Sequence, residues 1–144
     1  MTRQPLLTAQ ELTAYLNEVF PNAAHLAVIE SVGPMVARLR MGVSERHLRP
    51  GGTVSGPTMF TLADTAFYVA TMAMIGREAL TVTTSLTINF LSKPPAADLI
   101  AEARILKLGR LLSVGDVSIW SVGRSDGPVA HASVTYAIPP RRSA

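Results

Sequence analysis

A long apolar stretch in the middle of the chain constrains the fold more than any other feature of the sequence. It runs from Pro57 to Gly76 and contains a single charged residue, Asp64. Proline suits the first turn of an α-helix and glycine its end, so the stretch predicts one helix of about twenty residues. Threonines and Asp64 interrupt it, and it is apolar on nearly all sides. We therefore interpret it as a helix buried inside a protein rather than as a membrane span.

Asp64 lies on the one polar stripe of the predicted helix. Four residues with hydroxyl groups share this stripe at three- and four-residue spacing: Thr61, Thr65, Tyr68 and Thr71. Moving an unpaired carboxylate out of water is costly, so Asp64 requires hydrogen-bond partners or a chemical task. Two interpretations remain open from the residues alone. One is a buried carboxylate capped by Thr61 or Thr65. The other, which we favour, is a catalytic carboxylate that acts with the glycine-containing loop eight residues upstream.

The remaining periodic segments predict a sheet around this helix. Residues 8–20 form an amphipathic helix that begins at an N-cap threonine. Two strands flank a Gly33-Pro34 turn within residues 25–43. Strand-like runs follow the long helix at residues 82–90, 99–109, 111–123 and 128–138. This order predicts an α+β protein in which a meander of largely antiparallel strands wraps around the helix.

We expect a single domain over residues 1–144, with a short tail at 139–144. In the run 82–90, apolar and polar residues alternate. Strict alternation would place Thr83 on the opposite face of the sheet from Leu86 and Ile88.

Composition limits the kinds of function that the chain can have. There is no cysteine, which excludes disulfides and thiolate metal sites, and His25, His47 and His131 are too far apart for a metal-ligand motif. The net charge of +3 comes from scattered basic residues, which argues against nucleic-acid binding. With 48% hydrophobic and only 16% charged residues, we expect part of the surface to be buried against another copy. The start of the chain lacks a secretion-signal pattern, so we expect a cytoplasmic protein.

Residues 52–70, "GTVSGPTMFTLADTAFYVA", resemble the catalytic segment of hotdog-fold acyl-CoA thioesterases, most closely the branch named for phenylacetic-acid degradation. The resemblance covers roughly residues 25–138 and implies a hotdog fold, in which an antiparallel sheet wraps around a long central helix. It implies that the backbone N–H of Gly56 polarises the thioester carbonyl. It also implies that the carboxylate of Asp64 is the nucleophile or the general base.

Other matches to the family imply substrate-binding residues. Thr83 falls where the family often has a serine or threonine near the reacting water, and otherwise is an ordinary strand residue. Gly109 and Arg110 resemble a Gly-Arg turn near the CoA site, and otherwise form a hairpin turn. Arginine suits CoA phosphates because its planar fork of donors matches their geometry.

The sequence departs from the family pattern beside the glycine. The family histidine is replaced by Ser55, the glycine after it by Pro57, and the family asparagine falls on Arg49. We assign Ser55 and Arg49 to substrate binding, with helix capping as the alternative for Ser55. For Arg49 the alternatives are an ion pair with Asp64 and a solvated loop position.

The resemblance therefore predicts a thioester hydrolase that takes acyl-CoA and needs no cofactor or metal, since CoA is part of the substrate. We expect a homodimer or a dimer of dimers, that is, a homotetramer, with no nucleic-acid or membrane partner. The alternative is a non-catalytic hotdog protein that binds acyl-CoA or a related ligand. A hotdog dehydratase ranks below both, because it needs a histidine near the start of the helix. Ser55 stands there, and His47 lies eight residues earlier.

Overall fold

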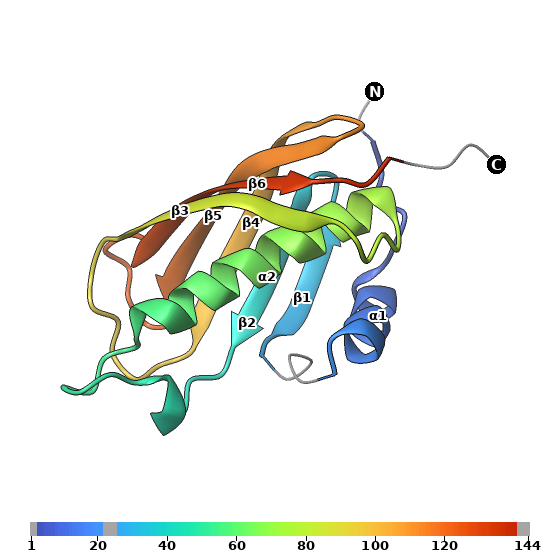
Figure 1. Ribbon diagram of the computed structural model, residues 1–144. Coiled ribbons are helices and arrows are strands. Elements are labelled where there is room, and N and C mark those ends of the chain that lie inside the picture. Colours follow the sequence, from blue (N-terminus) through green and yellow to red (C-terminus); the bar gives the residue numbers. More distant parts are fainter. Residues whose placement is uncertain (1–2, 22–25, 141–144) are drawn as a thin grey trace.

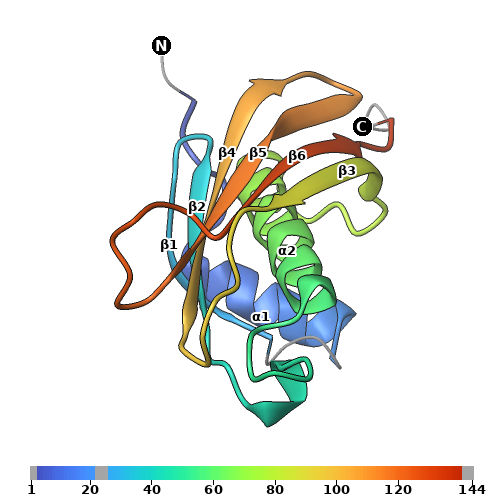
Figure 2. The same ribbon diagram turned by 90° about the vertical axis from the view of Figure 1, so that its left-hand side faces the viewer.

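The computed structural model describes residues 3–21 and 26–140. A single helix lies in the concave face of a curved sheet, as the two perpendicular views show (Figures 1 and 2). All strand pairs are antiparallel, in the spatial order β1-β2-β4-β5-β6-β3. The predicted α+β architecture is confirmed.

Most predicted elements are confirmed to within one or two residues. The helices are α1 (Ala9–Val19), α2 (Gly56–Ile75) and the short 3-10 helix η1 (Glu45–His47). The strands are β1 (Val28–Gly33), β2 (Val36–Met41), β3 (Val82–Phe90), β4 (Leu99–Leu108), β5 (Leu112–Ser121) and β6 (Ala130–Ala137). His25 lies outside the described residues, and the predicted tail is described only as far as Pro140.

Helix α2 begins and ends where the sequence predicts. The Ser55 hydroxyl caps its N-terminus, Pro57 lies in its first turn, and Gly76 ends it with a φ of 95° that favours glycine. From Ala66 to Ile75 every side chain is buried. Among the described helices, α2 alone is long and apolar enough to cross a membrane, with a mean hydropathy of 1.3. However, 72% of that stretch is buried inside the domain.

Strand β3 differs from the prediction in two ways. A meander would place β3 beside β4, but β3 pairs with β6 at the edge of the sheet, and β4 pairs with β2. The pairing with β6 also shifts register between Thr83 and Ser85. As a result, Thr83 lies opposite Tyr136 and contacts α2, on the same side as Leu86. The predicted alternation is wrong at Thr83 because one extra residue in a strand reverses the facing of the residues beyond it.

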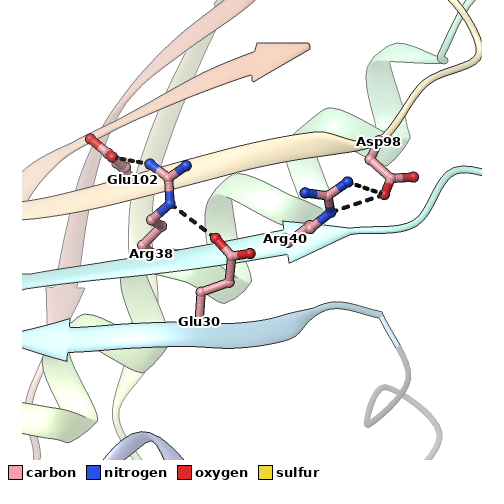
Figure 3. Close-up of polar contacts among 5 residues, drawn as sticks. All are labelled: Glu30, Arg38, Arg40, Asp98 and Glu102. Atoms are coloured by element: carbon pink, nitrogen blue, oxygen red, sulfur yellow. Dashed lines mark hydrogen bonds and ion pairs between the residues drawn. The ribbon is translucent and has the colours of Figure 1, made fainter. Parts of the chain in front are cut away.

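The outer face of the sheet carries paired charges (Figure 3). Arg38 donates to Glu30 at 2.9 Å and to Glu102 at 2.5 Å, and Arg40 pairs with Asp98 at 2.9 Å. These side chains are substantially exposed, so each pair contributes only about 0–1 kcal/mol to stability. Because both arginines already have carboxylate partners, this part of the sheet offers little to an anionic ligand.

Helix α1 packs beside β1 and against α2 (Figure 1). The predicted N-cap is confirmed: Thr8 and Glu11 form a reciprocal capping box, with both hydrogen bonds at 3.1 Å. Leu12 and Tyr15 are buried, and Phe20 at the C-cap lies edge-to-face against Tyr68 of α2, with 5.5 Å between the ring centres.

Candidate active site

The carboxylate of Asp64 is held by two hydroxyl groups from the sheet. Thr83 at the start of β3 donates to Oδ1 at 2.8 Å, and Tyr136 near the end of β6 donates to the same oxygen at 2.5 Å. The Tyr136 hydroxyl also lies 2.8 Å from the backbone carbonyl of Asp64. Hydrogen bonds to an ionised acceptor are short and strong. Oδ2 accepts no hydrogen bond from the described residues.

The capping partners suggested by the sequence are wrong. Thr61 instead donates to the backbone carbonyl of Pro57 at 3.0 Å, one turn back along α2. A threonine inside a helix commonly bonds to the carbonyl four residues earlier, which uses its hydroxyl locally. Thr65 lines the pocket beside Asp64 but forms no side-chain hydrogen bond to it in the described structure. The fixed partners of the carboxylate therefore come from strands, not from its own helix.

Tyr136 is the member of the candidate site that sequence reasoning missed. Burial first, and then the carboxylate of Asp64, raise the pKa of Tyr136 above its ordinary value, so the hydroxyl stays protonated and remains a donor. The alternation in the last predicted strand does place Tyr136 on the inward-facing row, with Val134 and Ala132. That alternation does not identify Tyr136 as a partner of Asp64, because the order of the strands along the chain does not show that β6 pairs with β3.

A pocket of about 280 Å³ opens beside Asp64. Its walls come from the C-terminal part of α1, the middle of α2, the start of β3 and the end of β6. The lining residues are Leu16, Phe20, Asp64, Thr65, Tyr68, Thr81, Val82, Thr83 and Tyr136. Asp64 is the only charged residue among them, so the pocket combines an apolar and aromatic interior with one carboxylate.

No cation balances the charge of Asp64 in the described part of the chain. None of its ion pairs involves this carboxylate. The suggested ion pair with Arg49 is not formed, and Arg49 lines a different pocket. A half-buried carboxylate that has no cation and faces a pocket is a candidate catalytic base or nucleophile.

Gly56 is the first residue of α2, and its amide is available for a ligand. Pro57 has no N–H, Thr58 donates to the hydroxyl of Ser55 at 3.3 Å, and Met59 donates to the Ser55 carbonyl at 3.3 Å. Gly56 is thus the one N–H of the first turn without an acceptor among the described residues. The N-terminus of a helix also carries a partial positive charge, which favours a developing oxyanion.

Two hollows meet at Gly56. One, of about 450 Å³, is lined by Gly56, Pro57, Phe60, Thr61, Ile88 and Phe90. The other, of about 420 Å³, contains the cationic residues Arg49 and Lys93. Both include the ring of Phe90, which lies so close to Gly56 that a Cβ there would approach it to 3.1 Å. A side chain at Gly56 would therefore displace the ring.

Ser55 and His47, which lie in the segment that leads to Gly56, form hydrogen bonds with residues close to them in the sequence. The capping interpretation of Ser55 is confirmed, because its hydroxyl accepts from the N–H of Thr58 and lies 2.7 Å from the Thr58 hydroxyl. His47 is held within its own turn, where its Nδ1 accepts from the N–H of Ser44 at 2.9 Å. Burial lowers the pKa of His47, which keeps this ring neutral as an acceptor.

The structure brings only some of the predicted site residues together. Thr83 joins Asp64, whereas Gly56 lies eight residues earlier on α2, about 12 Å along the axis and about 80° around it. Gly109 and Arg110 line a hollow with Ile75 at the opposite end of α2. A single chain therefore does not place the amide of Gly56, the carboxylate of Asp64 and the guanidinium of Arg110 around one reacting atom.

Comparisons with known proteins identify the family. The thioesterase superfamily matches residues 51–128. A protein from Silicibacter sp. TM1040, itself only inferred to be a thioesterase, is 46% identical and has a TM-score of 0.88, with 97% of each chain covered. The phenylacetic acid degradation protein of Thermus thermophilus, solved as a mutant, is 25% identical with a TM-score of 0.72, over 83% of this chain and 99% of that one.

A further structural relative, from Streptococcus mutans, was solved with acetyl-CoA bound. It is 22% identical, with a TM-score of 0.71, over 81% of this chain and 91% of that one. No curated protein matches the sequence. The family match covers more than half of the chain, and the Silicibacter relative shares the fold over nearly all of it. The chain belongs to the thioesterase superfamily and has its hotdog fold.

Proposed function

We propose that the protein hydrolyses acyl-CoA thioesters and that Asp64 acts as the nucleophile or general base. The observation that carries this proposal is the carboxylate itself. Two hydroxyls hold its Oδ1, while Oδ2 has no donor among the described residues and a pocket lies beside it. A carboxylate that is fixed on one oxygen and free on the other is suited to take a proton from water or to attack a carbonyl carbon.

Both routes use the amide of Gly56 in the same way. Attack on the thioester carbon converts the carbonyl to a tetrahedral oxyanion, which the Gly56 N–H stabilises. The C–S bond then breaks, and CoA leaves as a thiolate that takes up a proton. If Asp64 is the base, it removes the proton from the attacking water. If it is the nucleophile, a mixed anhydride forms first and water hydrolyses it. A single turnover in ¹⁸O-labelled water places ¹⁸O in the Asp64 carboxylate only by the second route.

The complete site requires a second copy of the chain. Strand β3 lies at the edge of the sheet and exposes Val82 and Phe90, at 55% and 51% of their surface. An exposed edge strand with apolar residues is suited to pair with another strand. In a two-fold dimer paired along β3, Gly56 of one copy would face Asp64 of the other. We therefore propose a homodimer as the catalytic unit, which two such dimers extend to a tetramer.

Mixing two inactive variants tests this arrangement. Gly56→Val and Asp64→Asn are unfolded together, refolded and assayed. Half of randomly formed dimers are hybrids, and each hybrid has one intact site, so the mixture regains about a quarter of wild-type turnover. A mixture as inactive as its components would contradict the shared site, as would light scattering that finds only single chains at micromolar concentration.

Turnover of a panel of acyl-CoA thioesters tests the function itself. Asp64→Asn keeps the shape and can still accept hydrogen bonds, but it loses the charge. We expect turnover to fall by about two to four powers of ten. The fold and the oligomer should survive, which a thermal melt of the variant beside the wild type checks. Unaltered turnover in Asp64→Asn would contradict the catalytic role.

A wild type inactive on every thioester would instead favour the non-catalytic binding protein. That alternative has one observation in its support, because the Ser55 hydroxyl is committed to the helix cap and offers the substrate no imidazole. Phenylacetyl-CoA belongs in the panel, because assignment to the phenylacetic-acid branch is part of the proposal. The cytoplasmic location remains a prediction.

A further inference from the structure

The pocket beside Asp64 has one wall that the family match does not include. Leu16 and Phe20 of α1 line it, and α1 lies outside the matched residues 51–128. The ring of Phe20 lies edge-to-face on Tyr68, which packs in turn on Tyr136 with 6.1 Å between ring centres. Helix α1 thus supplies part of the wall of the pocket that contains the carboxylate.

The chemistry of this wall selects for an uncharged, apolar group. Apart from Asp64, every lining residue in the described part of the chain is apolar, aromatic or a threonine. A charged group entering the pocket would lose water without gaining a partner of opposite sign, except beside the carboxylate. An aromatic ring or an alkyl chain would instead gain contacts with Phe20, Tyr68 and Leu16.

The size of the pocket limits the length of that group. Its volume is about 280 Å³. A water molecule takes up about 30 Å³ of the liquid. A methylene group is of similar size, so the pocket holds about nine carbon atoms. An aryl group or a medium-length acyl chain fits this space, whereas a long fatty acyl chain exceeds it.

We propose that this pocket receives the acyl group of the thioester and accepts aryl or medium-length acyl groups of up to about nine carbons. In this proposal Phe20 sets the upper limit on the length of the acyl group. The inference rests on the proposed function, because it takes Asp64 as the group that meets the thioester. Phe20 is a specificity-determining residue rather than a catalytic one. The residue is 43% exposed and forms no contact with Asp64 among the described interactions, so removal of its ring opens the pocket without altering the donors to the carboxylate.

Chain-length profiles of kcat/KM test the proposal, using straight-chain acyl-CoAs from two to fourteen carbons and phenylacetyl-CoA. In the wild type, kcat/KM should rise about fourfold for each methylene buried until the pocket is full, and then fall. Phe20→Ala should move the optimum at least two carbons longer. Phe20→Trp should move it shorter. Opposite shifts exclude a general loss of stability as the cause.

Leu80→Ala is the matched control, because this side chain is 77% exposed and does not line the pocket. Its profile should equal that of the wild type. If thioesters are hydrolysed but Phe20→Ala, Phe20→Trp and the wild type share one chain-length profile, the inference is overturned and the proposed function stands.

The same variants separate the two proposals if the wild type hydrolyses nothing. Calorimetric titration with CoA thioethers of the same chain lengths, which cannot be hydrolysed, then gives the dissociation constants. Shifts of the preferred length by Phe20→Ala and Phe20→Trp in opposite directions would support the acyl pocket even without turnover. A flat dependence on chain length, or an optimum that neither variant moves, would overturn it.

Discussion

Replacing Tyr136 by phenylalanine removes one hydroxyl from the support of Asp64 and little else. The side chain is 3% exposed, so the ring keeps its packing. A hydrogen bond to a charged group contributes about 1.5–3 kcal/mol to stability. Asp64 retains the bond from Thr83 at 2.8 Å and faces a pocket that water can enter. We therefore expect a loss near the lower end of that range, about 1.5 kcal/mol in the free energy of unfolding.

Chemical denaturation of four proteins measures this bond separately from the rest of the site. These are the wild type, Tyr136→Phe, Asp64→Asn and the double variant, which together form a double-mutant cycle. Asparagine still accepts a hydrogen bond but is neutral, and charge-assisted bonds are about twice as strong as neutral ones. The cost of Tyr136→Phe should therefore fall by about half when residue 64 is asparagine.

Turnover provides an independent reading of the same bond. If the Tyr136 hydroxyl holds the carboxylate in place during hydrolysis, Tyr136→Phe should lower kcat about tenfold, the equivalent of about 1.4 kcal/mol. A coupling of zero in the stability cycle would refute the hydrogen bond as we describe it. The expected coupling together with an unchanged kcat would retain the bond and refute its part in catalysis.

Two adjacent threonines on β3 provide a matched pair of variants. Thr83→Val removes a donor to Asp64 and should lower kcat by about one power of ten. The Thr84 hydroxyl instead bonds a backbone carbonyl at 3.2 Å, so Thr84→Val should leave kcat unchanged. Gly56→Val should abolish most turnover, because loss of an oxyanion donor costs about two to three powers of ten in rate. Gly42→Ala is the control and should retain turnover, since a Cβ at Gly42 would form only an ordinary contact at 3.9 Å. Gly115→Ala should lower the melting temperature sharply or prevent folding, because a Cβ there would overlap the backbone carbonyl oxygen of Arg104 on β4 and lie 2.7 Å from the Phe67 ring.

The helices were predictable because their signals are local. Ser55, Pro57 and Gly76 occupy the cap and first-turn positions that such residues favour, and these choices depend on neighbours within a few positions. Thr8 and Glu11 similarly satisfy each other at the start of α1. The apolar surface of α2 also predicts that other elements surround it, and the strand-like runs that follow it in the sequence predict that these form a sheet.

The partners of Asp64 were not predictable, because they depend on pairing between distant strands. Nothing in the order of the segments shows that β3 leaves its neighbour in sequence and pairs with β6. The register shift between Thr83 and Ser85 then turns Thr83 toward α2 and places it beside Tyr136. Strict alternation gives the opposite facing, so the residues alone left Thr83 as an ordinary strand position, and only the family resemblance indicated a role.

The proposed site has two parts, the loop that leads to Gly56 and the carboxylate of Asp64 with its two donors. Because these parts share no contacts among the described interactions, the departures from the family pattern affect only the first part. Arg49 and Ser55 lie in the loop before α2, beside Gly56, and neither contacts Asp64 among the described interactions. The donors to Asp64 come from β3 and β6 instead. On the proposed function, substitutions in the loop would change how the thioester and its CoA are held at the helix N-terminus, and they would leave the support of the carboxylate intact. On this reasoning, loss of the family histidine and asparagine alters substrate preference before it removes the capacity for hydrolysis.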